Sequence, residues 1–157
     1  MNATKFTKLV LSLAFPLAVG AIAGVFTSAA IQDWYVTLNR PSFNPPNWIF
    51  APVWTTLYII LGISLFLVWI LPAGKDRDRA LVAFCVQMIL NFGWSFFFFY
   101  FKTIGFALAE IFMLWISIVL MIVLFYKVKP IAAYINIPYL LWVSFAAVLN
   151  AAYFLLN

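Results

Sequence analysis

The sequence predicts an all-α integral membrane protein built as a bundle of five transmembrane helices. Hydrophobic residues make up 68% of the 157 residues and charged residues only 8%, whereas soluble globular proteins carry about 25% charged residues. The apolar residues form long runs near the ~20 residues that a helix needs to cross a bilayer, and the short alternating segments of a membrane barrel do not occur. We therefore expect one transmembrane domain over residues 1–157, with its functional site within the bundle or under its loops.

Five apolar runs are the predicted spans, and their ranges are 9–31, 48–71, 80–101, 104–126 and 132–156. The first run is longer than the ~7–15 apolar residues of a signal peptide, so we expect a retained helix. Within it, Gly20 and Gly24 form a G-x-x-x-G pattern, which lets another backbone approach closely. Packing against another helix of the same bundle is favoured over a dimer contact.

The basic residues predict the topology. Seven of them fall on the side that carries the N-terminus and the second and fourth loops, namely Lys5, Lys8, Lys75, Arg77, Arg79, Lys127 and Lys129. Only Arg40 and Lys102 fall on the other side. Because basic residues concentrate in cytoplasmic loops, we expect a cell-membrane protein with a cytoplasmic N-terminus and an outward-facing first loop. The net charge of +5 is explained in the same way and gives no reason to infer a nucleic-acid partner.

The segment Trp34–Tyr58, which joins the first two spans, holds three of the seven tryptophans and four of the eight prolines. A proline ring removes an N–H donor and favours extended geometry in the preceding residue. We therefore expect an ordered, extended cover. An interfacial belt, a packed lid and a site for a flat apolar ligand each account for such aromatic density. The density itself and the polar residues of the later spans favour the lid together with the ligand site.

Polar and aromatic residues share one helical face in the third and fifth spans. The third-span face carries Gln87, Asn91, Trp94 and Phe98, and the fifth-span face carries Tyr139, Trp142, Ala146, Asn150 and Tyr153. Polar side chains in a bilayer turn inward. These faces predict a mostly apolar cavity under the first loop, with Trp142 as its floor and Trp54, Asn91 and Trp94 as its walls.

Three further positions allow more than one interpretation. For Gln87, hydrogen bonding between helices is an equal alternative to a place in the cavity. The aromatic run 96–100 is expected to contact lipid. Glu110 is an ionisable residue inside the fourth span and thus a functional hypothesis, but a protonated or water-accessible carboxyl group, or one paired near Lys102, together outweigh a proton-coupled role.

The sequence resembles the TspO/MBR family, the tryptophan-rich sensory proteins related to the mitochondrial translocator protein, also called the peripheral benzodiazepine receptor. The motifs occur in family order and are W-Y-x-x-L at 34–38, R-P-S-F-x-P-P-x-W at 40–48, A-P-x-W-x-x-L-Y at 51–58, Q-x-x-x-N-x-x-W at 87–94, A-L-A-E at 107–110, P-Y-L-L-W at 138–142 and L-N at 149–150. They cover nearly the whole chain from the first loop onward.

This resemblance implies a five-helix bundle, commonly a homodimer, whose first loop covers a pocket for protoporphyrin IX or haem as ligands rather than obligatory cofactors. The same pocket takes isoquinoline and benzodiazepine-type molecules. The family is also linked to light-dependent porphyrin degradation, with tryptophans at the positions of Trp54 and Trp142 implicated. Carried over by motif position, the ligand-binding residues are Tyr35, Pro46, Trp54, Asn91, Trp94 and Trp142.

Two positions depart from the family pattern. The proposed sterol motif needs a basic residue after a tyrosine near the end of the fifth span, but Tyr153 is followed only by Phe-Leu-Leu-Asn. Many relatives carry tryptophan where this chain has Phe43, which keeps the stacking area and loses an N–H donor. Sterol binding through that motif is therefore not expected.

Three classes of function follow from the sequence. The first is a tetrapyrrole-binding sensor or receptor, the second a transporter of porphyrins or lipids, and the third a membrane scaffold. No nucleophile–base pair or metal site indicates a conventional enzyme, since the chain lacks histidine and has only Cys85. A photochemical reaction needs only a bound photosensitiser and a nearby indole. Haem iron is usually held by His, Cys, Met or Tyr, and this chain lacks histidine. We therefore expect the protein to bind the porphyrin through its plane rather than through its metal.

Overall fold

The computed structural model describes residues 3–157, and within that range the chain forms helices and loops with no strand. The long helices are α1 (Ala3–Gln32), α2 (Phe50–Trp69), α3 (Lys75–Ser95), α4 (Ile104–Val128) and α6 (Ile137–Leu156), with a short α5 (Pro130–Tyr134) before the last. Three shorter turns complete the chain, namely η1 (Tyr35–Thr37), η2 (Asn47–Ile49) and the π-turn η3 (Phe96–Tyr100). Five helical segments of the described chain are long and apolar enough to cross a membrane, as predicted.

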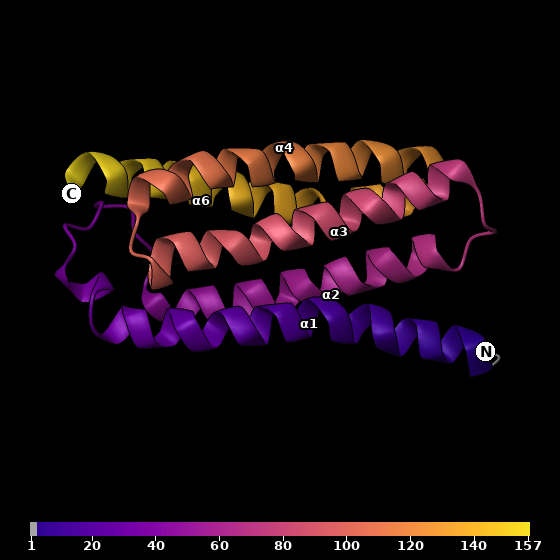
Figure 1. Cartoon of the computed structure of the whole chain (residues 1–157), viewed down its shortest axis with the longest axis horizontal. Helices are drawn as coiled ribbons and strands as arrows, with labels where there is room; N and C mark the ends of the chain where they lie inside the picture. Colours follow the sequence, from indigo (N-terminus) through magenta and orange to yellow (C-terminus); the bar gives the residue numbers. More distant parts are fainter. Residues whose placement is uncertain (1–2) are drawn as a thin grey trace.

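The long helices run side by side and alternate in direction (Figure 1). The first loop, residues 33–49, and the C-terminus lie at one end of the bundle, and the N-terminal end of α1 and the α2–α3 connection lie at the other. We call the first of these the loop end. Helix α1 packs mainly on α2, α3 on α4, and α4 on α6. This is a multi-pass membrane protein whose basic loops gather away from the loop end.

The fifth predicted span, 132–156, is confirmed as a segment that can cross a membrane, Pro130–Leu156, but it is divided into two helices. The chain turns after α5 at Ile135 and Asn136, and α6 begins at Ile137. Pro138 in the first turn of α6 has no N–H to continue a helix from α5, which is why the helix restarts here. The side-chain amide of Asn136 donates to the backbone carbonyl of Ala132 (2.7 Å), which stabilises the turn between the two helices.

The aromatic run 96–100 is also only partly a lipid-facing belt. The chain widens there into a π-turn, with the amide of Phe101 bonded to the carbonyl of Phe96 (2.8 Å). Phe98 and Phe99 are only 3% and 9% exposed, while Tyr100 faces outward. The expected lipid contact is therefore wrong for Phe99 and for Phe98, and the place of Phe98 on the inward face of the third span is confirmed.

The close approach predicted for the G-x-x-x-G pattern occurs inside the bundle. A Cβ atom added at Gly20 would overlap the ring of Tyr58 on α2, whereas one added at Gly24 would meet no atom within 4 Å. A Cβ atom at Gly62 would lie 2.8 Å from the backbone of α1. Glycine thus sets the spacing of α1 and α2 at Gly20 and Gly62, which confirms the expected packing within the chain.

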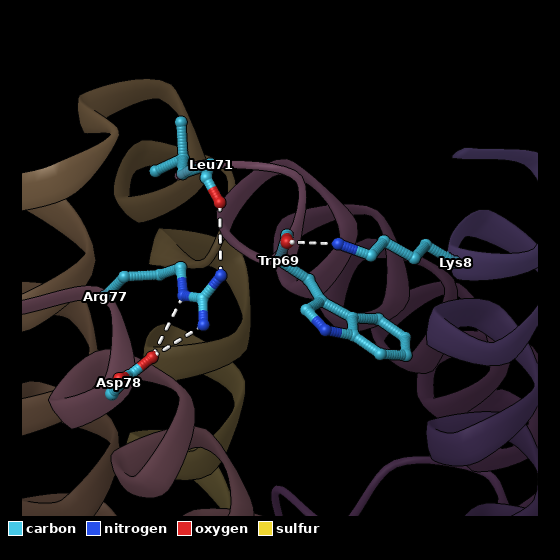
Figure 2. A network of polar contacts seen from close by, with 5 residues as sticks. All are labelled: Lys8, Trp69, Leu71, Arg77 and Asp78. Atoms are coloured by element: carbon cyan, nitrogen blue, oxygen red, sulfur yellow. Dashed lines mark hydrogen bonds and ion pairs between the residues drawn. The ribbon is translucent and has the colours of Figure 1, made fainter. Parts of the chain in front are cut away.

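Two basic side chains donate hydrogen bonds to backbone carbonyls near the end of α2 that lies opposite the loop end (Figure 2). The ammonium group of Lys8 donates to the carbonyl of Trp69 (3.1 Å), and the guanidinium of Arg77 donates to the carbonyl of Leu71 (3.2 Å). Arg77 is held in turn by Asp78 (2.8 Å). The last carbonyls of a helix have no intrahelical partner and attract cations. The Lys8 contact therefore joins α1 to the end of α2, and the Arg77 contact joins the first turn of α3 to the connection that follows α2.

Candidate functional site

A cavity of about 560 Å³ lies in the half of the bundle that faces the first loop. Segments of α1, the first loop, α2, the α3–η3 region and α6 line it, and no lining residue carries a charge. Nine aromatic side chains contribute to the lining: Tyr35, Phe50, Trp54, Tyr58, Trp94, Phe98, Phe99, Trp142 and Tyr153. The cavity is therefore aromatic and largely apolar, as the sequence predicts.

The α2 wall is made by two stacked rings. Trp54 and Tyr58 are one helical turn apart, and their ring centroids lie 5.6 Å apart with the planes inclined by 29°. Trp54 also meets the edge of Tyr139 from α6 at 6.4 Å. The indole of Trp54 thus has aromatic neighbours on two sides and lines the cavity at a fixed angle.

Trp94 and Trp142 line the cavity from α3 and α6. The indole N–H of Trp94 donates to the side-chain oxygen of Asn150 (3.0 Å), and the amide of Asn150 donates to the carbonyl of Ile104 (3.1 Å). The indole nitrogen of Trp142 is buried and has no hydrogen-bond partner among the described residues. Trp94 is therefore fixed by a hydrogen bond, whereas the indole N–H of Trp142 is enclosed by the protein without a partner.

The first loop covers the loop end of the cavity through Tyr35. Its hydroxyl donates to Asn44 (3.0 Å) and accepts from Tyr153 of α6 (2.7 Å). The guanidinium of Arg40 lies 5.6 Å from the centre of the Tyr35 ring. Burial raises the pKa of Tyr35 above its ordinary value, so the phenol stays neutral.

A second contact ties the middle of the loop to the end of α6. The backbone amide of Asn39 donates to the side chain of Asn157 (2.8 Å), and the Asn157 amide donates back to the Asn39 carbonyl (3.2 Å). The Asn39 side chain also donates to the carbonyl of Leu156 (3.1 Å). We call this set of bonds the latch. The ordered cover predicted from the prolines and tryptophans is therefore present and anchored to α6.

Comparison with known proteins shows which family this chain belongs to. Residues 12–156 match the TspO/MBR family. The chain belongs to this family. It is 40% identical to tryptophan-rich protein TspO of Archaeoglobus fulgidus over 150 residues, which cover 96% of this chain and 97% of the relative. It is 41% identical over 152 residues to tryptophan-rich protein TspO of Chlorobaculum tepidum, covering 95% of each chain. The human translocator protein is 36% identical over 120 residues, covering 74% of this chain and 70% of that protein.

The TspO/MBR fold brings four of the six predicted site residues together at the cavity, namely Tyr35, Trp54, Trp94 and Trp142. Pro46 and Asn91 do not line it. Asn91 lies behind the α2 wall, where its side-chain oxygen accepts from the Tyr58 hydroxyl (2.8 Å) and its amide donates to the Tyr139 hydroxyl (3.0 Å). The placement of Asn91 in the wall is therefore corrected: it holds a ring that forms the wall.

Tyr139 continues this buried chain of hydrogen bonds by donating to the side-chain oxygen of Gln87 (2.9 Å). Gln87 is fully buried and does not line the cavity. Of its two interpretations, hydrogen bonding between helices is therefore the one that the structure supports. Glu110 also lies outside the lining and is only 3% exposed. Of the interpretations left open for Glu110, pairing near Lys102 is not found, because Lys102 contacts Asp33 instead (3.7 Å).

Several lining residues were not among the predicted site residues. Tyr58 follows Trp54 by one turn, and that spacing is the signal that identifies it. Phe99 has no such signal, because its inward direction depends on the π-turn. Gly24 lines the cavity by leaving space, which an apolar pattern does not reveal.

Proposed function

We propose that this TspO/MBR protein is a membrane receptor that holds a tetrapyrrole, protoporphyrin IX or haem, in the cavity under the first loop. The observation that carries the proposal is an uncharged cavity of about 560 Å³ faced by aromatic rings from α2, α3 and α6. Ligand pockets of this size and lining bind flat, mostly apolar molecules. Isoquinoline and benzodiazepine-type molecules suit the same cavity.

The binding mode follows from the groups available. Trp54, Trp94 and Trp142 present ring faces and edges against which a macrocycle packs. Arg40 beside Tyr35 supplies a positive charge at the loop for the carboxylates of a porphyrin.

The macrocycle rather than its metal is the expected point of recognition. The chain has no histidine, and the described residues contain no group of three acidic, cysteine or histidine residues placed to hold a metal ion. We therefore expect metal-free protoporphyrin IX and haem to bind with similar affinity.

Light-dependent degradation of a bound porphyrin is a further activity that the cavity supports. Trp54 and Trp142 both line it, so an excited porphyrin would lie beside two oxidisable indoles. Transport of porphyrin or lipid has less support, because the one acidic group of the helix interiors, Glu110, does not reach the cavity. The proposal places the receptor in the cell membrane as a homodimer with a cytoplasmic N-terminus.

The test is a titration of the purified protein in detergent with protoporphyrin IX, followed by quenching of tryptophan fluorescence. We expect saturable quenching in the wild type and weaker quenching in Trp54→Phe, in Trp142→Phe and most of all in the double variant. Trp115→Phe is the matched control, because Trp115 bonds to Ser144 away from the cavity. Quenching that does not saturate in the wild type would overturn the proposal and favour a scaffold.

The same double variant tests the photochemical activity. Illumination of the wild-type complex should bleach the porphyrin absorbance faster than illumination of the double variant at equal occupancy. Equal bleaching rates would exclude Trp54 and Trp142 from the reaction while leaving the receptor function intact.

A further inference from the structure

The cavity reaches the surface of the bundle between α1 and α2. Five of its lining residues are also exposed, and we call them the mouth: Ala21, Gly24 and Ser28 from α1, with Ala51 and Thr55 from α2. A residue that both lines a cavity and is exposed belongs to its rim. The first loop covers the end of the cavity, whereas the mouth opens its side.

The deeper end of the mouth, at Thr55, lies at the depth of the hydrocarbon layer. Trp48, just before α2, is 73% exposed and is a residue type that collects at the membrane–water interface. Thr55 lies seven residues further along, or about 10 Å deeper at ~1.5 Å per residue. Ile22 and Val25 of α1 and Ile59 of α2 are exposed apolar neighbours. At Thr55 the mouth therefore faces acyl chains rather than water.

The chemistry of the rim suits contact with lipid. The hydroxyl of Thr55 donates to the carbonyl of Ala51 (2.8 Å), and the hydroxyl of Ser28 donates to the carbonyl of Val25 (3.0 Å). Each hydroxyl is thus satisfied by its own helix and does not have to seek a partner in the bilayer. Every rim side chain is small, so the gap between the helices is not filled.

The two glycines of α1 differ in a way that marks the opening. Tyr58 packs against Gly20 and leaves no room for a side chain there. One turn nearer the loop end, the space beside Gly24 is open, since an added Cβ atom would meet nothing within 4 Å. The opening therefore begins where the contact between Gly20 and Tyr58 ends.

We propose that planar, mostly apolar ligands enter and leave the cavity sideways through the mouth, directly from the hydrocarbon layer, while the first loop stays closed. This inference rests on the proposed function in that its ligand is a tetrapyrrole already dissolved in the membrane. Entry from water would require the latch between Asn39 and Asn157 and the bonds of Tyr35 to break. Entry through the mouth requires none of these contacts to break.

The first test obstructs the mouth and measures kinetics. Gly24→Phe puts a ring into the open space, and Val25→Phe puts the same ring on the exposed face next to it, outside the lining. Proteoliposomes loaded with protoporphyrin IX are mixed with excess empty vesicles, and the recovery of tryptophan fluorescence is followed. A rim obstruction slows entry and exit alike, so we expect Gly24→Phe to slow both association and release about tenfold or more. Val25→Phe should release at the wild-type rate.

The second test closes the other route. Asn39→Cys and Asn157→Cys in a Cys85→Ser background are joined by a short bis-maleimide, which fixes the loop on α6. We expect the release rate to stay at the wild-type value after cross-linking. Release that stops on cross-linking but is unaffected by Gly24→Phe would overturn the inference and show that the ligand leaves past the first loop.

The third test needs no porphyrin. Thr55→Cys in the Cys85→Ser background is exposed to a maleimide dissolved in the bilayer or to a sulfonated maleimide confined to water. We expect rapid labelling from the bilayer and slow labelling from water. The reverse order would overturn the inference that the mouth opens to the hydrocarbon layer. This result decides the inference even if the porphyrin titration shows no saturable binding, in which case only the proposed receptor function fails.

Discussion

Asn91 acts on the cavity through its neighbours, because its amide binds the hydroxyls of Tyr58 and Tyr139. Asn91→Leu would leave two phenols without these partners, at a cost of about 1–2 kcal/mol for two hydrogen bonds within a membrane bundle. We expect a lower Tm in detergent and weaker protoporphyrin binding, since the Tyr58 ring is no longer held against Trp54. Thermal unfolding and the fluorescence titration measure the two effects.

Gln87→Leu is the matched control for this residue-scale prediction. Gln87 is bonded to Tyr139 at the far end of the same hydrogen-bonded chain and does not line the cavity. It should lower the Tm while leaving protoporphyrin affinity near the wild-type value. If Asn91→Leu removed binding with no change in Tm, Asn91 would have to contact the ligand directly.

Helical spacing identifies which residues share a face but not how deep each one lies. Asn91 and Trp94 belong to one predicted face of α3, and only Trp94 lines the cavity. The difference arises because Tyr58 and Tyr139, from two other helices, enclose the Asn91 side chain. The tryptophans of the site could therefore be predicted from sequence, whereas the position of Asn91 depends on residues more than 30 positions away.

At the scale of elements, the packing of α1 on α2 depends on Gly20. We expect Gly20→Ala to destabilise the bundle by about 1–3 kcal/mol, as overpacking does in a filled core. The Tyr58 ring cannot move aside easily, since it is stacked on Trp54 and its hydroxyl is bonded to Asn91. Gly24→Ala makes the same change in helix propensity where there is open space, so it should leave the Tm unchanged or slightly raised. Equal Tm values for the two variants would contradict the close contact of Gly20 with Tyr58.

The end of α2 gives a second prediction at this scale. Lys8→Met removes the ammonium group that bonds to the carbonyl of Trp69 and lies 5.5 Å from the centre of its ring. We expect a loss of about 1 kcal/mol, typical of one hydrogen bond, measured by chemical denaturation in detergent. Lys127→Met, in the last turn of α4, removes the same charge without touching α2 and should cost less. An equal loss in both variants would indicate an effect of net charge alone.

The five spans were predictable because apolar length is a property of the sequence itself. The break between α5 and α6 and the π-turn at 96–100 were not predicted, although Pro138 carries a signal for the first. The π-turn has no local signal. It directs Phe98 and Phe99 against Tyr35 of the first loop, at centroid distances of 6.3 Å and 5.9 Å. Its inward rings therefore depend on a segment that is distant in sequence.

At the scale of the whole molecule, the cavity has two boundaries that differ in kind. The first loop is bound to α6 by the latch and by Tyr35, so its opening requires hydrogen bonds to break. The mouth is a gap between small residues of α1 and α2, and it requires no bond to break. Because the two boundaries share no residue, the motion of one can be changed without changing the other.

Asn157→Ala separates these two boundaries experimentally. It removes the side chain that exchanges hydrogen bonds with Asn39, which in an exposed position is worth about 1 kcal/mol in total. We expect amide hydrogen exchange to rise about fivefold across residues 37–44, since open states of the loop become more populated by that energy. Porphyrin release should stay at the wild-type rate, because the ligand leaves between α1 and α2. Thr7→Ala removes an exposed hydrogen bond within α1, near the opposite end of the bundle, and should change neither quantity. Faster release in proportion to the rise in exchange would instead mean that the loop and the mouth open together.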